Sequence, residues 1–202
     1  MAEAEIKLYT DYKSPYAFLA FDPVMALAER FAVRVTWKPF QLRIKGKGQR
    51  SVYSEYKVRY SYMDARRWAN LRGGIVLRGP LKIYDTEPAL IGGLFARDHG
   101  KLIEYSRIVY TRFFRRELEI DQAEAVADVL AELGLDTAAF AAYLEGAGKA
   151  EYEAIQAESA EDQIFGVPIM AFEKELFWGY DRIPLLEMRL REKGLERGAS
   201  GP

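Results

Sequence analysis

A strand-helix-strand pattern over residues 5–38 restricts most strongly what this chain can fold into. Residues 5–10 have the length and apolar character of a strand, and residues 33–38 alternate Val or Trp with polar side chains, as half-buried strands do. Between them, residues 14–31 place apolar side chains mostly on one helical face. Two strands joined by such a helix pair in parallel, and the crossover is almost always right-handed. The chain is therefore expected to open with a β-α-β unit.

The turn at residues 11–16 joins the first strand to this helix and carries the first candidate functional group. Ser14 followed by Pro15 is typical of an N-cap and a first helical residue, so we expect the helix to begin there. Pro23 lies inside the helical pattern and should bend the helix or start a second one. The first amide groups of a helix favour an anion, such as a thiolate or a carboxylate. By itself, however, a Ser-Pro pair more commonly marks only a helix start.

The middle of the chain is helical by pattern, and the last part returns to strands. Residues 43–48 are rich in Arg, Lys and Gly, so a loop is expected there. Helices are then expected at residues 53–71, 89–99, 102–114, 122–133, 137–144 and 149–164. Two short apolar segments at residues 169–172 and 176–178 flank a polar turn and predict a hairpin. A final helix is expected over residues 183–193.

The sequence contains no cysteine, which excludes disulfide bonds, thiolate metal sites, cysteine nucleophiles and dithiol redox chemistry. His99 is the only histidine and precedes a glycine at an expected helix end. A capping or exposed role is more common there than a catalytic one, and no metal cluster can be built around it. Any nucleophilic chemistry must therefore come from other side chains or from a bound molecule.

The formal net charge of the chain is only −1, and the sequence has no strongly basic tract. This balance gives no reason to expect nucleic acid or an anionic membrane surface as a partner. No apolar run approaches the roughly 20 residues that span a bilayer, and the first residues lack the pattern of a secretory signal. We therefore expect a soluble, cytoplasmic protein.

Four groups of residues occur in a fixed order along the chain. They are Asp11 with Ser14-Pro15-Tyr16, Tyr60-Ser61-Tyr62-Met63 with Arg67-Trp68-Ala69, Phe165-Gly166-Val167-Pro168, and Leu176-Phe177-Trp178-Gly179-Tyr180-Asp181-Arg182. This set resembles the 2-hydroxychromene-2-carboxylate isomerase family, which is related to the kappa-class glutathione transferases. In the related disulfide oxidoreductases, Cys-x-x-Cys stands where this chain has Ser14-Pro15-Tyr16-Ala17. A cis-proline loop stands where it has Val167-Pro168.

The resemblance implies an α/β protein with a thioredoxin-like fold and a large inserted all-helical domain. The first part of the thioredoxin-like domain would cover residues 1–44 as β-α-β, and the inserted helical domain residues 45–163. Residues 164–202 would form the second part as β-β-α. Folding both ends onto one sheet, with the insertion packed against it, also buries the apolar faces of the expected strands and helices.

The resemblance also implies glutathione, or another low-molecular-weight thiol, as the cofactor. Ser14 is the candidate catalytic residue, because the family serine at this place contacts the sulfur and favours its thiolate. The expected thiol-binding residues are Ser14, Val167, Pro168, Tyr180 and Asp181, with Val167 offering its backbone and Asp181 binding the γ-glutamyl end. The expected substrate-binding residues are Tyr16, Lys57, Arg67, Trp68, Asp85 and Trp178. The substrate would be a small aromatic molecule, and a homodimer is a further expectation.

Three positions depart from the family pattern. Gly48 stands where many relatives have an asparagine that helps to hold active-site groups, and Asp85 stands where the family usually has Asn. Lys13 stands where a small or polar residue is commoner. The added carboxylate of Asp85 would repel an anionic substrate unless Arg or Lys neighbours compensate. These departures leave the substrate and the identity of the thiol open.

Each candidate also has a structural explanation: Asp181 as a helix N-cap, and Trp68 and Trp178 as core residues. Three functions therefore stay open. The first is a thiol-dependent cis-trans isomerase that acts on aromatic-catabolism intermediates by reversible thiolate addition. The others are a kappa-like glutathione transferase that conjugates an electrophile, and a non-catalytic thioredoxin-like binding module without Cys-x-x-Cys. A relatively enclosed aromatic pocket between Ser14, the helix at residues 53–68 and Trp178 would favour either enzyme.

Overall fold

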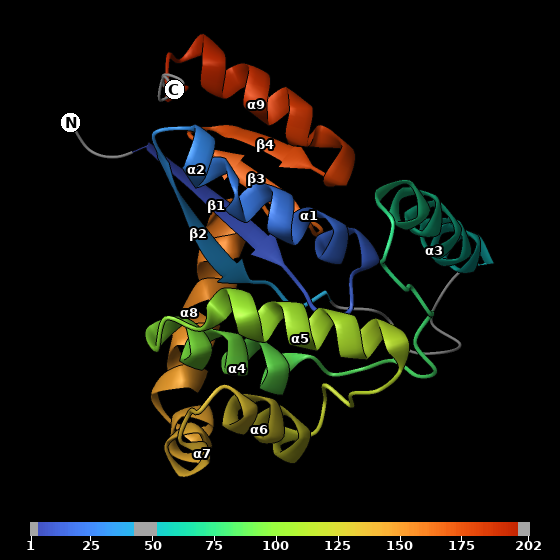
Figure 1. The fold of residues 1–202 in the computed structure, drawn as a ribbon, viewed down its shortest axis with the longest axis vertical. Coiled ribbons are helices and arrows are strands. Elements are labelled where there is room, and N and C mark those ends of the chain that lie inside the picture. Colours follow the sequence, from blue (N-terminus) through green and yellow to red (C-terminus); the bar gives the residue numbers. More distant parts are fainter. Residues whose placement is uncertain (1–3, 43–51, 198–202) are drawn as a thin grey trace.

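The computed structural model describes residues 4–42 and 52–197, whose arrangement is shown in Figure 1. Within these residues the strands are β1 (Ala4–Thr10), β2 (Val33–Pro39), β3 (Ile169–Phe172) and β4 (Glu175–Trp178). The helices are α1 (Pro15–Met25), α2 (Leu27–Arg30), α3 (Val52–Arg72), α4 (Glu87–Asp98), α5 (Leu102–Arg115), α6 (Ala123–Glu132), α7 (Thr137–Glu145), α8 (Ala147–Glu161) and α9 (Ile183–Glu192), with a 3-10 turn at Tyr180–Arg182. Every strand and helix expected from the sequence is present, with small shifts at the ends.

The four strands form one mixed sheet in the order β2-β1-β3-β4. β1 and β2 are parallel, with Ile6 opposite Val35, which confirms the expected β-α-β unit. β3 and β4 form the expected hairpin, and β3 is antiparallel to β1 with Tyr9 opposite Ile169. The polar turn of the hairpin is shorter than the sequence indicated, because Glu175 already belongs to β4. Both ends of the chain therefore contribute to one sheet.

α1 begins as the sequence predicted. Ser14 is its N-cap, and the Ser14 Oγ accepts a hydrogen bond of 3.2 Å from the amide of Ala17. Pro15 follows as the first helical residue, where a missing N–H leaves no helical bond unmade. Pro23 lies near the end of α1, which stops at Met25, and the short helix α2 follows. This agrees with the expectation that Pro23 bends the helix or starts a second one. Local capping chemistry thus fixes Ser14 directly after the end of β1.

The helices between β2 and β3 occupy two separate places around the sheet. Figure 1 shows α4, α5, α6 and α7 gathered on one side, where α4 and α8 contact β2. α3 stands apart from them, next to the N-terminal end of α1, which it contacts. α9 lies at the opposite end of the sheet, beside β4. The helical segment therefore both covers the β2 edge and places one long helix beside the Ser14 turn.

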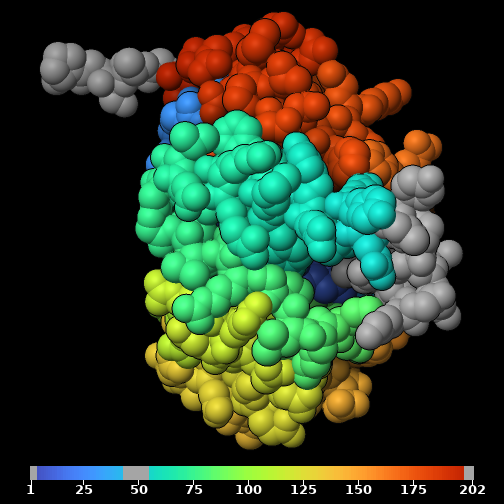
Figure 2. Space-filling model, turned by 90° about the vertical axis from the view of Figure 1, so that its right-hand side faces the viewer, coloured from blue at the N-terminus to red at the C-terminus, as the bar shows by residue number. Residues whose placement is uncertain are grey.

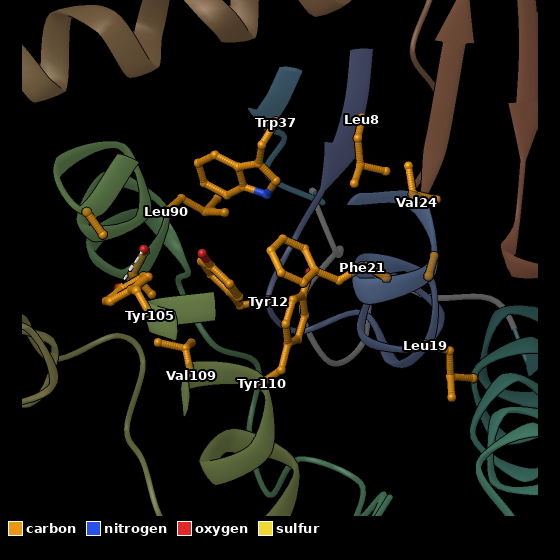
Figure 3. Packing of buried hydrophobic residues seen from close by; sticks show 14 of the residues in the cluster. Leu8, Tyr12, Leu19, Phe21, Val24, Trp37, Leu90, Tyr105, Val109 and Tyr110 are labelled. Atoms are coloured by element: carbon orange, nitrogen blue, oxygen red, sulfur yellow. Dashed lines mark hydrogen bonds between the residues drawn. The ribbon is translucent and has the colours of Figure 1, made fainter. Parts of the chain in front are cut away.

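The hydrophobic core runs from the sheet into the helices that follow α3. Its centre is an aromatic group drawn in Figure 3, in which Tyr12 meets Tyr110 edge to face with ring centroids 4.8 Å apart. The Tyr12 hydroxyl lies 2.9 Å from Ser106 Oγ, so its polar end is satisfied inside the core. The Trp37 Nε1 donates to Thr10 Oγ1 at 2.7 Å. Residues adjoining the Ser14 turn are thus anchored in the most buried part of the molecule.

We expect Gly93→Ala to destabilise this core. A Cβ atom at Gly93 would lie 2.6 Å from Trp37 Cη2 and 2.8 Å from the Tyr12 hydroxyl oxygen, and both rings are buried. Overpacking of this kind typically costs about 1–3 kcal/mol, of which the better helix propensity of alanine returns roughly 1 kcal/mol. Urea unfolding would measure the loss. Gly79→Ala is the matched control, because the nearest atom to its new Cβ would be 4.0 Å away.

One expected loop lies outside the described residues, and the histidine lies at a helix end. Gly48 and the basic loop at residues 43–48 lie outside the described residues. His99 is the C-cap of α4, with its Nδ1 2.8 Å from the carbonyl oxygen of Phe95, which agrees with a position at a helix end. Of the helices in residues 4–42 and 52–197, none is long and apolar enough to cross a bilayer.

Candidate active site

The ends of β1, β3 and β4 meet at the N-terminus of α1. β1 continues into the turn that carries Ser14, and the β1–β3 register places Ile169, the first residue of β3, opposite Tyr9. Trp178 at the end of β4 is also opposite Ile169, and the amide of Gly179 donates to the Pro168 carbonyl at 2.9 Å. The sheet therefore gathers Ser14, Val167, Pro168, Trp178, Tyr180 and Asp181 at one edge.

Ser14 is nearly enclosed, with 4% of its surface exposed. Its Oγ accepts from the amide of Ala17, and among the described residues its hydroxyl hydrogen has no acceptor. In the first turn of α1, Pro15 has no N–H and the Ala17 amide is already bonded, so the Tyr16 amide is the remaining donor. A free hydroxyl beside an unused amide at a helix start can stabilise an anion.

The loop before β3 brings backbone groups to the same edge. The Val167–Pro168 peptide bond is cis, as the resemblance implied. Val167 is buried, and within the part of the chain that the structure describes its amide and carbonyl form no backbone hydrogen bond. Groups of this kind can pair with an extended peptide, as at an open strand edge.

Trp178 is a fixed surface residue rather than a core residue, since 47% of it is exposed. Its indole lies against Gly166, where a Cβ atom would approach the Trp178 Nε1 to 2.9 Å. The ring also meets Phe165 edge to face, with centroids 5.0 Å apart. The Lys57 ammonium of α3 lies 5.7 Å from the indole centroid, in reach of a cation–π interaction. These contacts hold the indole beside the cis-proline loop.

A small cavity of about 220 Å³ lies next to this edge, lined by Trp68, Tyr180 and Asp181 among others. Trp68 and Tyr180 meet edge to face with ring centroids 5.3 Å apart. Asp181 lies in the 3-10 turn, and the N-cap of α9 is Arg182 instead. The Asp181 carboxylate is half exposed and lies 2.6 Å from the Arg182 Nη1. It can therefore receive a further cationic group from the solvent side.

α3 separates this small cavity from a second, larger one. Helical spacing places Lys57, Asp64 and Trp68 on one face of α3, and Tyr62 and Arg66 on the opposite face. The first face is held against α1, because the hydroxyl of Tyr16 donates to Asp64 Oδ2 at 2.8 Å. Burial and the Asp64 carboxylate raise the pKa of Tyr16, so its hydroxyl stays protonated at neutral pH. The position of α3 beside the Ser14 turn is thus fixed.

The larger cavity has a volume of about 750 Å³ and opens between α3 and residues 79–84. Its lining is mostly apolar, and it includes Lys13, the residue before Ser14. The uncharged lining residues are Val58, Tyr62, Gly79, Pro80, Leu81, Ile83 and Tyr84, and the charged ones are Lys13, Glu55, Arg59, Arg66 and Lys82. Figure 2 shows a hollow between α3, in cyan, and the green segment after it, with dark-blue atoms of the N-terminal part visible inside. Cavities of this size accommodate small molecules.

A buried ion pair beside Ser14 was not expected from the sequence. Asp11 is fully buried, and its Oδ2 accepts from the amide of Leu42 at 2.8 Å. The Lys13 Nζ lies 3.4 Å from the same Oδ2 and donates to the Tyr84 carbonyl at 3.3 Å. Burial raises the pKa of Asp11, and the Lys13 charge opposes that shift. The pair ties the Ser14 turn to the segment after β2 and to the segment before α4.

Of the expected substrate-binding residues, Asp85 lies away from the others, and Arg67 is exposed. Asp85 lines neither cavity, and its Oδ1 accepts from the Gln41 Nε2 at 2.5 Å and from the Glu87 amide at 3.1 Å. Arg67 is exposed, and its Nη1 lies 3.6 Å from Asp64 Oδ1 on the face of α3 that Tyr16 contacts. The face of α3 with Lys57, Asp64 and Trp68 contacts Trp178, Tyr16 and Tyr180. Ser14 and Asp181 are close neighbours in the chain of Tyr16 and Tyr180. The Val167–Pro168 loop is bonded to Gly179, next to Trp178, whereas Asp85 lies apart from these residues.

Another cavity of about 750 Å³ lies along β1 and β3, away from the Ser14 turn. Its Lys7 ammonium is held by Asp162 at 2.6 Å and by Glu158 at 2.8 Å. The Tyr9 hydroxyl donates to the same Asp162 carboxylate at 2.6 Å. Because these charges compensate one another, we place the candidate active site at Ser14 instead.

The donors at the Ser14 turn suit a thiolate, and the surrounding residues suit a peptide that carries one. The free Ser14 hydroxyl and the Tyr16 amide can hold a sulfur anion, the Val167 backbone can pair with an extended chain, and Asp181 can hold an amino group. Residues 4–42 and 52–197 contain no group of three or more His, Asp or Glu placed to bind a metal ion. The Ser14 hydroxyl, the Tyr16 amide and the Val167 backbone fit a thiol such as glutathione.

Comparison with known proteins gives consistent results. The family model of the DSBA-like thioredoxin domain matches residues 5–191. The 2-hydroxychromene-2-carboxylate isomerase of Pseudomonas putida is 28% identical over 190 residues, which cover 90% of this chain and 92% of that protein. The solved structure of a 2-hydroxychromene-2-carboxylate isomerase has a TM-score of 0.79 at 27% identity, covering 94% of this chain and 96% of that one. The cytosolic disulfide reductase DsbM of Pseudomonas aeruginosa shares the fold, with a TM-score of 0.67 at 18% identity over 93% of this chain and 99% of that one.

Proposed function

Because the chain belongs to the DSBA-like thioredoxin domain family and yet contains no cysteine, we propose that it uses a bound thiol as an isomerase of the 2-hydroxychromene-2-carboxylate type. Its fold is thioredoxin-like with a helical insertion, as expected from the sequence. Dithiol-disulfide exchange is excluded, since that reaction needs two cysteine sulfurs. Relatives at 25% and 28% identity carry the isomerase name over about nine tenths of this chain.

One observation carries this proposal. Ser14 caps α1 with a hydroxyl hydrogen that has no acceptor among the described residues, at the place where the disulfide oxidoreductases keep a cysteine. A hydroxyl cannot exchange disulfides, but it can donate to a sulfur anion. Together with the start of a helix, such a donor lowers the pKa of a thiol and raises the thiolate fraction at neutral pH.

Other residues of this chain would bind the thiol-bearing peptide and the substrate. Val167 would pair with the cysteinyl part of the thiol-bearing peptide, and Asp181 would hold its γ-glutamyl end. The cavity that includes Lys13 would hold the aromatic substrate. When bound, the thiol supplies a nucleophile that adds reversibly to a conjugated double bond, so that the former double bond can rotate before the thiol leaves. The Ser14 hydroxyl and the Tyr16 amide would hold the sulfur charge, while the apolar wall of the cavity keeps water away.

An isomerisation assay tests the proposal. We expect 2-hydroxychromene-2-carboxylate to change its absorbance with enzyme and glutathione together, much faster than with either alone. The glutathione should be recovered unchanged, because no atom of the thiol remains in the product. Mass spectrometry of the product separates this outcome from that of a transferase, which would leave the sulfur attached. Absence of both reactions with glutathione and with other cellular thiols would reject an enzymatic role for this site.

A further inference from the structure

Lys13 differs from the other cations around the 750 Å³ cavity in its degree of burial. Lys13 is 8% exposed, whereas Arg59, Arg66 and Lys82 are exposed. The Lys82 ammonium is also occupied by Glu119 at 2.8 Å and by a second carboxylate. An exposed cation is hydrated and screened by salt, so it discriminates weakly between a charged and a neutral ligand. A buried ammonium discriminates strongly.

The Lys13 ammonium also keeps one donor unused. One of its three N–H groups donates to the Tyr84 carbonyl at 3.3 Å, and the ammonium faces Asp11 Oδ2 at 3.4 Å as an ion pair. No third acceptor is found among the described residues, and Lys13 belongs to the cavity wall. The carboxylate of Asp11 forms an ion pair with the ammonium and fixes its position.

We propose that Lys13 is the specificity-determining residue that binds the carboxylate of the substrate in the cavity between α3 and residues 79–84. The aromatic part of the substrate would lie against the apolar wall made by Val58, Tyr62 and Ile83. This inference rests on the proposed function for the identity of the substrate. It places the carboxylate of the substrate at Lys13, the residue directly before Ser14 in the chain.

Binding of two matched probes tests this role without thiol or turnover. Cinnamate carries an aromatic ring with a conjugated carboxylate, and cinnamamide has the same shape without the charge. Wild-type protein should bind cinnamate about tenfold or more tightly than cinnamamide, as expected for a hydrogen bond to a charged group. Lys13→Met should lose this preference and still bind cinnamamide. Lys38→Met is the matched control, because Lys38 forms a half-buried ion pair with Glu158 at 2.8 Å outside the cavity, and it should keep the preference.

If Lys13→Met does not fold, the double variant D11N/K13M tests the same role of Lys13. It removes both buried charges together, so it should bind cinnamamide like the wild type and show no preference for cinnamate. A preference for cinnamate in either Lys13 variant would overturn the inference. Loss of cinnamamide binding in the double variant, or equal affinities in the wild type, would overturn it too. If the wild type prefers cinnamate but has no isomerase activity, the proposed function fails while the assignment of the anion contact to Lys13 stands.

Discussion

Replacing Ser14 with alanine is expected to lower thiol-dependent isomerase activity at neutral pH by about a hundredfold or more, the loss typical of removing one donor from a developing anion. Among the described residues, Ser14 places a free hydroxyl at the start of α1, so the variant leaves the sulfur charge to the helix amides alone. The thiol should then ionise at a higher pH, and the activity profile should move to higher pH with it. Calorimetry adds an independent measurement: wild-type protein should prefer glutathione to its S-methyl derivative, and Ser14→Ala should lose that preference.

The same substitution removes a helix cap, which typically costs about 0.5–2 kcal/mol of stability. Asp136→Ala is a matched control, because Asp136 caps α7 by accepting from the Ala138 amide at 2.8 Å, far from the site in sequence. It should lose similar stability and keep its activity and pH profile. Equal activity losses in the two variants would show that Ser14 acts only as a cap. Unchanged activity of Ser14→Ala would reject its catalytic role.

The start of α1 could be predicted from the sequence because its causes are local. An N-cap serine bonds an amide three residues later, and a proline fits the first helical position, so Ser14 and Pro15 suffice to place the turn. The strands were predictable for a similar reason, since alternation within residues 33–38 reports which side chains face the core. That the Ser14 turn meets the cis-proline loop could be predicted only from the family resemblance. No local sequence pattern encodes the order of strands in a sheet.

The ion pair and the larger cavity could not be predicted in this way. Lys13 meets the carbonyl of Tyr84, 71 positions further along the chain, in a segment without regular structure. No periodicity marks such a partner, and sequence alone identified Lys13 only as a departure from the family pattern. The exposed position of Trp178 could not be predicted either, because it depends on contacts with Gly166 and Lys57, which hold the indole at the surface. Tertiary contacts between irregular segments decide these features, and local sequence does not encode them.

Breaking the Asp11–Lys13 pair from one side is expected to destabilise the protein strongly. Lys13→Met should cost about 3–5 kcal/mol, since it leaves the fully buried Asp11 carboxylate without its counter-charge. That loss is large against the roughly 5–15 kcal/mol that typically stabilises a domain. The double variant D11N/K13M should be more stable than Lys13→Met, because no buried charge is left unpaired. Urea unfolding of Lys13→Met, Asp11→Asn, D11N/K13M and the wild type gives the coupling energy, and a value near zero would contradict a buried ion pair.

The pH dependence of stability in these variants should identify Asp11 as the titrating group. Burial raises the pKa of Asp11 in the folded protein above its unfolded value, so the folded state holds the proton more tightly. Stability contributed by this group is therefore present at low pH and decreases as the pH rises from about 4, the unfolded pKa, to the folded one. Removing Lys13 removes a charge that opposes the shift, so the total decrease should be larger and extend to higher pH in Lys13→Met than in the wild type. In D11N/K13M this decrease should be absent, and an unchanged slope in that variant would mean that another group is responsible.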